Sequence, residues 1–181
     1  MEEAVRLIRA LWTEKRTTFH GTYFQAEDAI LEPKPLQQPH PPILIAGGGE
    51  QMTLRAVARL GQACNVFGTP DAVKRKFDIL HRHCEAENRN YDEIERTTST
   101  RLLLARDEAT LAAKAARLGT ELGGAGFAFA DGFEFVGTTS KAIDRVGQYR
   151  DAGVQLFISS ALKNDAETLE LLATDIIPHF A

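Results

Sequence analysis

Residues 47–53 carry the residue types best suited to holding a ligand, because a short apolar run enters three consecutive glycines and then a helical pattern. Gly47, Gly48 and Gly49 permit positive φ and let a ligand approach the backbone closely. A helix that begins just after them leaves unpaired main-chain N–H groups, which favour a phosphate. Thr53, one turn into the helix, adds a hydroxyl donor. The spacing therefore indicates an anion site.

Glu50 supports a competing interpretation of the same turn. Its carboxylate could cap the helix N-terminus itself, which would leave a tight turn with no ligand. Two other phosphate motifs fit less well, because a dinucleotide fingerprint needs a third glycine where Met52 stands and a P-loop needs a Gly-Lys-Ser/Thr ending that is absent. The residues alone leave the anion site and the closed turn both open.

Other residues with chemical potential give weaker indications. His81, His83 and Cys84 share one expected helix, but positions i and i+2 diverge by about 200° around it, so we expect no metal site. Asn65 points a polar group out of an apolar run toward the strand end where barrel enzymes place their sites, although it could equally cap a neighbouring loop. We find no pair of a nucleophile and a base, so the catalytic residues are unknown.

The elements that would position the turn alternate between strands and helices. Residues 43–46 form a continuous apolar run, which is typical of a parallel strand covered on both faces, and a helical stripe then ends at Gly61. Further expected elements are strands at 63–67, 97–105 and 154–160, helices capped by Thr69, Asp107 and Asp165, and a helix at 138–152 after a long loop at 123–137. The last helix should turn Leu169, Leu172 and Ile176 inward and end before Pro178.

These elements predict a single α/β domain over residues 1–181. A helix, a small hairpin around His20-Gly21 and a proline-rich connector occupy residues 1–42, and about four parallel βα units occupy residues 43–181. A closed (β/α)8 barrel takes about 250 residues, with roughly 200 as a floor. The chain therefore encodes either a small open sheet or half a TIM-type barrel.

Composition narrows the class of protein. The chain is 44% hydrophobic with a net charge of −4, and its charges are interspersed, so we expect no nucleic-acid partner. No apolar run is long enough to span a membrane, and the start, Met1-Glu2-Glu3-Ala4, lacks a signal-peptide pattern. Cys64 and Cys84 are expected to be buried free thiols. We expect a cytoplasmic globular protein without a membrane partner.

Four motifs occur in an order that resembles a known family. They are the hairpin F-x-G-x-Y, the connector P-K-P, the turn P-I-L-I-x-G-G-G-E and the helix start G-T-P-x-x-V. Residues 10–97 and 135–159 together resemble the C-terminal half of the luciferase-like monooxygenases, in the branch of the coenzyme F420-dependent oxidoreductases. The resemblance implies an (α/β)8 barrel that binds F420, or alternatively FMN, with the tricyclic ring over the strand ends.

The resemblance also implies roles for particular residues. Gly47, Gly48, Gly49 and Thr53 would help to seat the phosphate tail of the cofactor, and Cys64 and Asn65 would lie near it. Family members usually carry an acidic residue where this chain has Gly61-Gln62. The family's first strands, which carry the residues that face the reactive ring edge, have no counterpart here.

The lack of a counterpart to the family's first strands leaves three hypotheses about function. The first hypothesis is an oxidoreductase that transfers hydride to or from a small organic substrate, with an isolated chain that lacks the catalytic half and is inactive. The alternatives are a non-catalytic half-barrel that binds a phosphate or cofactor, and a structural half that assembles with a partner. Because a half-barrel exposes strand edges and the inner sheet face, we expect a homo-oligomer or a complementing N-terminal half-barrel.

Overall fold

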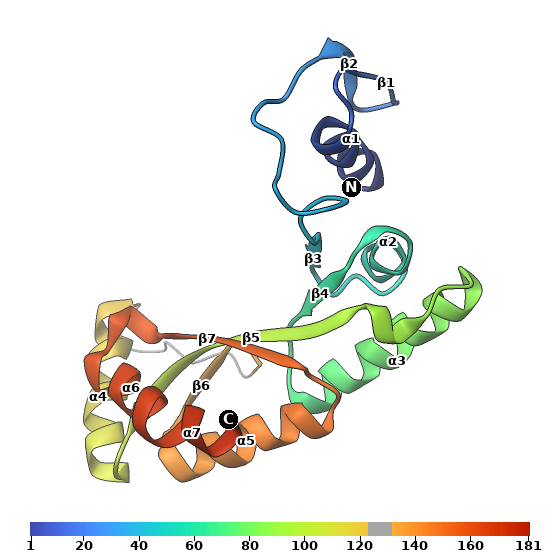
Figure 1. The fold of residues 1–181 in the computed structure, drawn as a ribbon. Coiled ribbons are helices and arrows are strands. Elements are labelled where there is room, and N and C mark those ends of the chain that lie inside the picture. Colours follow the sequence, from blue (N-terminus) through green and yellow to red (C-terminus); the bar gives the residue numbers. More distant parts are fainter. Residues whose placement is uncertain (123–131) are drawn as a thin grey trace.

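A five-stranded parallel sheet lined by helices forms the body of the protein, of which the computed structural model describes residues 1–122 and 132–181 (Figure 1). Its strands are β3 (Leu44–Ala46), β4 (Ala63–Val66), β5 (Glu95–Ala105), β6 (Glu134–Thr138) and β7 (Leu156–Ala161). The helices are α1 (Glu2–Thr13), α2 (Thr53–Leu60), α3 (Pro70–Ala86), α4 (Glu108–Leu122), α5 (Thr139–Asp151), α6 (Ala166–Leu171) and α7 (Ile177–Phe180). Shorter helical segments are η1 (Tyr91–Glu93), η2 (Leu162–Asn164) and the π-helical η3 (Leu172–Ile176).

The N-terminal residues form an arm beside the sheet (Figure 1). Helix α1 is followed by an antiparallel hairpin of β1 (Thr17–His20) and β2 (Gln25–Ala29), which confirms the expected hairpin. Lys34 in the proline-rich connector returns to the end of α1, where its ammonium donates to the carbonyls of Leu11 and Glu14 at 2.8 and 2.6 Å. The connector therefore packs back on the arm before the sheet begins.

The long strand β5 organises the sheet. Its residues 95–98 pair with β4, residues 101–105 pair with β6, and residues 97–102 pair with β7. Because the same residues of β5 pair with β7 and with either β4 or β6, the strands β4 and β6 follow one another along one edge of β5 and β7 takes the other edge. Strand β6 lies in the segment that we interpreted as loop, so the sheet has a fifth strand. Residues 123–131 of that loop lie outside the described part.

Alternation along the strands separates a helix-covered face from an open face. Cys64 and Val66 of β4 pack among buried residues of α2 and α3, including Leu54, Val73 and Phe77. Helices α3 and α5 lie on the same side of the sheet (Figure 1). Because α2 and α3 supply apolar stripes at helical spacing, this layer forms the main core.

The opposite face is open along β3 and β7. Leu44, Leu156 and Ile158 are 44%, 44% and 39% exposed, and strand pairing places them on one face. The prediction that residues 43–46 are covered on both faces is therefore wrong, because helices cover β3 on the Ile45 side alone.

The C-terminal helix departs from the prediction in two places. Leu172 and Ile176 are buried as predicted, but Leu169 is 50% exposed, and Thr168 and Leu171 take the inward positions of α6 instead. The helix also continues past residue 178, because a proline near the start of a helical segment loses no required hydrogen bond. None of the helices in the described part has both the length and the apolar character needed to cross a membrane.

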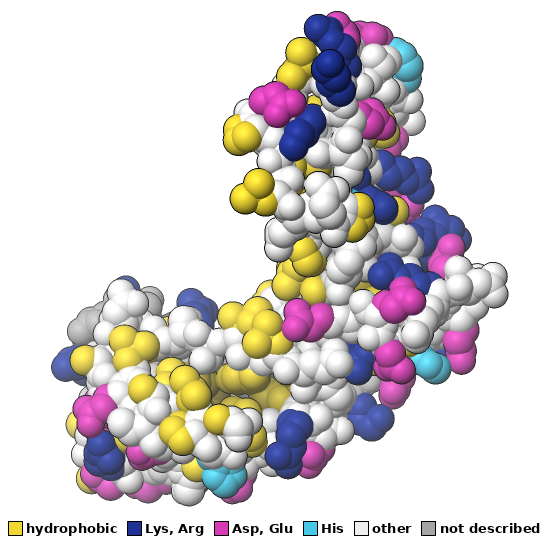
Figure 2. Space-filling view, in the orientation of Figure 1, with side chains coloured by type: hydrophobic (Ala, Val, Ile, Leu, Met, Phe, Trp, Pro, Cys, Tyr) yellow, Lys and Arg dark blue, Asp and Glu magenta, His cyan; other side chains and the backbone are white. Residues whose placement is uncertain are grey.

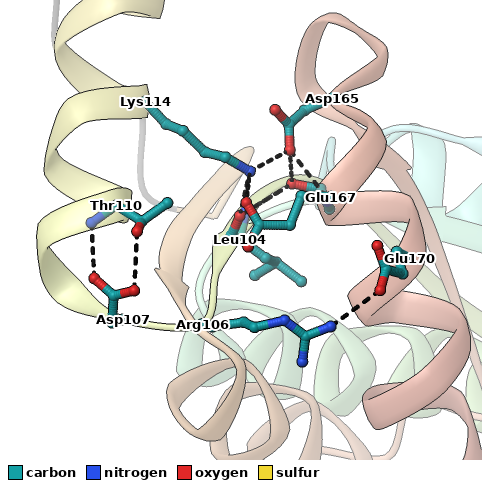
Figure 3. A network of polar contacts seen from close by, with 9 residues as sticks. Leu104, Arg106, Asp107, Thr110, Lys114, Asp165, Glu167 and Glu170 are labelled. Carbon is teal, nitrogen blue, oxygen red and sulfur yellow. Dashed lines mark hydrogen bonds and ion pairs between the residues drawn. The ribbon is translucent and has the colours of Figure 1, made fainter.

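A partly buried ion-pair cluster joins α4 to the start of α6 (Figure 3). The Lys114 ammonium contacts the carboxylates of Asp165 and Glu167 at 2.6 and 2.7 Å and donates to the Leu104 carbonyl at 3.0 Å. Asp165 also caps α6 by accepting from the Thr168 amide at 2.9 Å, as its sequence position predicted. The cluster fixes two helices at the carboxyl end of β5.

Candidate functional site

The glycine turn connects β3 to α2 and is held by the next strand. Gly47 has φ of +125°, a conformation that side chains disfavour, and its amide donates to the carbonyl of Asn65 at 2.9 Å. The amides of Thr53 and Leu54 both donate to the Gly49 carbonyl at 3.0 Å. Within the described part of the chain, no protein group accepts from the amides of residues 48–52. The turn therefore has main-chain N–H groups that are free to bind a ligand.

Glu50 does not cap α2. Its carboxylate pairs with Arg75, and its main-chain carbonyl accepts a hydrogen bond from His83 at 2.8 Å when that ring nitrogen is protonated. The N-cap residue is Met52, whose side chain makes no capping bond. The closed-turn interpretation is wrong in this respect, because α3 draws Glu50 away from the helix start.

Lys76 of α3 adds a positive charge behind the turn. Its ammonium donates to the Phe67 carbonyl at the end of β4, and a Cβ atom placed on Gly48 would lie 2.6 Å from its Nζ. Burial lowers the pKa of Lys76, the nearby Arg75 lowers it further, and the Glu50 carboxylate opposes the shift. A bound anion would offset that burial cost and raise the pKa again.

Sequence reasoning missed Lys76. It stands beside Lys74 and Arg75 on an expected helix, and nothing in the spacing of the three cations marks the one that reaches the turn. The packing of α3 against α2, through Leu80 and Phe77, decides which of them faces Gly48.

Thr53 lies where the sequence predicted. Its hydroxyl has no protein partner in the described residues, and a Cβ atom placed on Gly49 would lie 2.8 Å from its Oγ1. Real Cβ contacts are longer than this, so Gly49 is required for the hydroxyl to face the turn. The amides, the hydroxyl and the ammonium form a donor set with a net positive charge.

Asn65 holds the turn in place, and its side-chain amide is not free to bind a ligand there. The side chain is 8% exposed, its Nδ2 donates to Ser99 Oγ at 3.1 Å, and its Oδ1 accepts from Thr97 Oγ1 at 2.9 Å. Together with the bond from Gly47, these contacts support the interpretation of Asn65 as a cap of a neighbouring loop.

Cys64 lies on the other face of β4 from Asn65. It is fully buried among apolar side chains, and this burial raises the pKa of its thiol to about 11. Because successive strand residues point to opposite faces, Cys64 packs against the helices and does not join the donor set. Cys64 is therefore not part of the proposed site.

The histidine-rich stretch of α3 has structural contacts. His81 packs edge-on against Tyr91 with ring centroids 4.8 Å apart, His83 contacts the Glu50 carbonyl, and Cys84 is buried. In the described ranges, no three residues of the metal-ligating types come close enough to hold a metal ion.

Known proteins resemble this chain in sequence and in fold. The family model described as luciferase-like monooxygenase matches residues 1–125. An F420-dependent glucose-6-phosphate dehydrogenase of Kineococcus radiotolerans is 36% identical over 111 residues, which cover 60% of this chain and 32% of that protein. An FMNH(2)-dependent dimethylsulfone monooxygenase of Pseudomonas putida is 26% identical over 207 residues, covering 98% of this chain and 56% of that protein.

A solved structure supports the same fold. The coenzyme F420-dependent tetrahydromethanopterin reductase of Methanopyrus kandleri superposes with a TM-score of 0.77 at 16% identity, over 99% of this chain and 64% of that one. This similarity confirms the α/β fold of the luciferase-like barrel enzymes. The chain spans between about a third and a little over half of the two curated relatives described above.

Proposed function

The chain belongs to the luciferase-like monooxygenase family, and from that membership we propose that it is part of a flavin- or deazaflavin-dependent oxidoreductase. Its cofactor is coenzyme F420, with FMN as the alternative, since relatives named for each match this chain. The bound cofactor would supply hydride transfer to or from a small organic substrate. Two buried free cysteines fit a reducing compartment such as the cytoplasm.

One observation carries this proposal: the ammonium of Lys76 lies against Gly48 in a turn with unpaired amides. Both cofactors carry a phosphate on a flexible tail, and such a turn offers that phosphate main-chain donors, the Thr53 hydroxyl and a lysine charge. The absence of side chains at Gly48 and Gly49 lets the Lys76 ammonium and the Thr53 hydroxyl approach the turn, and Asn65 braces the turn from β4. These residues bind and orient the tail.

A direct test compares FMN with riboflavin, which has the same ring without the phosphate. We expect the purified chain to quench FMN fluorescence saturably and to bind riboflavin at least about tenfold more weakly, since charge-assisted hydrogen bonds to phosphate are strong. The same titration with F420 shows which cofactor is preferred. Equal affinity for FMN and riboflavin would show that the phosphate does not contribute to binding and would contradict the proposed phosphate site.

A second candidate function is a half-barrel that works only in an assembly. Leu44 and Leu156 expose the inner sheet face, and on the helix-covered face an apolar hollow of about 400 Å³ lies between β7, α5 and α7. Figure 2 shows hydrophobic side chains gathered around that hollow. A second copy of the chain, or a complementing N-terminal half, would cover the inner sheet face. Cofactor binding without turnover by the isolated chain favours this candidate.

A further inference from the structure

A small pocket lies on the open face of the sheet, next to the carboxyl end of β4. It measures about 280 Å³, near the lower end of ligand pockets, which run from roughly 300 to 1,000 Å³. Its lining comes from β5, β7 and the residues that flank β4 and β6, namely Phe67, Ser99, Thr100, Arg101, Phe133, Ile158, Ser159 and Ser160. Its size suits a small molecule.

Two contacts connect this pocket to the proposed phosphate site. Asn65 accepts from the Gly47 amide and donates to the hydroxyl of Ser99, which lines the pocket. Phe67 accepts from the Lys76 ammonium through its carbonyl, and it also lines the pocket. The pocket and the turn therefore lie at the same end of the sheet, so a cofactor whose phosphate is held at the turn would lie near the pocket.

Arg101 is the only charged residue in the pocket lining among the residues that the structure describes. Its guanidinium is 57% exposed and pairs with Glu134, which is 9% exposed and does not line the pocket. A carboxylate that sits behind an arginine fixes the guanidinium plane and leaves its other N–H groups for a ligand. The pairing therefore orients Arg101 toward the pocket.

The remaining walls divide into hydroxyl groups and apolar surfaces. Ser160 stands directly opposite Arg101 in the strand pairing, and Ser99 follows on the same face. Phe67 and Phe133 stack with ring centroids 5.7 Å apart at 14°, and Ile158 is 39% exposed. An oxyanion would pair with Arg101, and a flat apolar group would pack against Phe67.

We propose that this pocket binds the substrate of the enzyme and selects a small organic acid, with its oxyanion on Arg101 and its apolar part against Phe67 and Phe133. The inference rests on the proposed function, because it places the substrate of that reaction. It assigns a specificity role to Arg101 and no role in hydride transfer.

Benzoate tests this assignment, because it joins a carboxylate to a flat apolar ring. Calorimetric titration of the full chain should show saturable benzoate binding, with the neutral benzamide weaker by about tenfold or more, as expected for loss of a charge-assisted hydrogen bond. Arg101→Gln should weaken benzoate by a similar factor. Arg106→Gln is the matched control, because Arg106 is 56% exposed and pairs with Glu170 away from the pocket.

The double variant R101Q/E134Q guards against misfolding, because it replaces both members of the Arg101–Glu134 ion pair together. It should also lose benzoate affinity. The inference is overturned if the wild-type chain does not bind benzoate, if benzamide binds equally well, or if R101Q and R106Q behave alike.

A parallel FMN titration separates this inference from the proposed function. We expect R101Q to bind FMN as the wild type does. Benzoate binding without FMN binding would contradict the cofactor proposal and leave the pocket assignment standing, whereas FMN binding without benzoate binding would overturn the pocket assignment alone.

Discussion

The main-chain amide of Gly47 donates to the main-chain carbonyl of Asn65 at 2.9 Å, which ties the glycine turn to the neighbouring strand. The side chain of Asn65 continues the connection to Thr97 and Ser99 on β5. Three strands therefore hold the turn before any ligand arrives. Such preorganisation reduces the ordering cost of binding, because the donors already lie in place.

Replacing Lys76 by methionine should weaken cofactor binding by about tenfold or more, because the phosphate loses a charge-assisted donor. The stability of the fold should change by only about 1 kcal/mol, since one hydrogen bond to the Phe67 carbonyl is lost. Fluorescence titration and urea unfolding measure the two effects.

Lys74→Met is the control for this change. Lys74 is 61% exposed on the same helix and pairs with Asp78 at 3.7 Å. It should leave cofactor affinity within about twofold, because an exposed pair contributes little. Equal losses in both lysine variants would mean that the net charge of α3, rather than the position of Lys76, attracts the cofactor.

Acid should destabilise the protein through Asp165 (Figure 3). Burial raises the pKa of Asp165, but hydrogen bonds from Lys114 and Thr168 outweigh this and leave the pKa below its ordinary value. A carboxyl group with a lowered folded pKa stabilises the fold above its unfolded pKa, so this contribution is lost as the pH falls below about 4. The free energy of unfolding, measured by urea titration between pH 7 and pH 3, should fall accordingly.

Asp165→Ala should cost roughly 1–3 kcal/mol at pH 7, because it removes both the cap of α6 and a partner of the partly buried Lys114. The variant should show a smaller loss of stability on acidification than the wild type does. An unchanged acid dependence in this variant would assign the effect to other carboxylates.

The thiol of Cys64 should be unreactive in the native protein. It is fully buried, and its pKa of about 11 leaves almost no thiolate at pH 8. A maleimide assay should label neither Cys64 nor the buried Cys84 within minutes, and both after denaturation. Rapid labelling of Cys64 in the native protein would show that the thiol is accessible and would make it a candidate residue of the cofactor site again.

The open sheet face should drive self-association of the isolated chain. Leu156→Arg places a charge on that face and should shift the protein toward monomer, whereas Leu169→Arg changes an exposed residue of α6 and should not. Light scattering at micromolar concentration checks both variants. A monodisperse wild-type monomer would contradict this prediction.

Local signals explain which parts of the fold were predictable. Thr69, Asp107 and Asp165 accept hydrogen bonds from amides three residues later, so the helix starts followed directly from residue type and spacing. Strand β6 was missed because its five residues follow a glycine-rich stretch and pair only with the far end of β5. Its formation depends on a partner far away in sequence.

Only part of the candidate site was likewise predictable from the sequence. The glycines and Thr53 were predictable because a strand, a turn and a helix start occur together in the sequence. Lys76 was not, because its approach to Gly48 depends on how α3 packs against α2. Cys64 was assigned to the cofactor by resemblance, and strand alternation places it on the opposite face from Asn65.

Titration of F420 and of FMN into the wild-type chain and into Gly48→Val tests the central claim most directly. A side chain at Gly48 displaces the end of the flexible Lys76 side chain, so the fold should survive while the anion site is lost. Gly147→Val is the control, because nothing lies within 4 Å of a Cβ atom at that helical position. We predict saturable cofactor binding to the wild type and the control, and none to Gly48→Val. Equal binding to all three proteins would contradict the assignment of the phosphate to this turn.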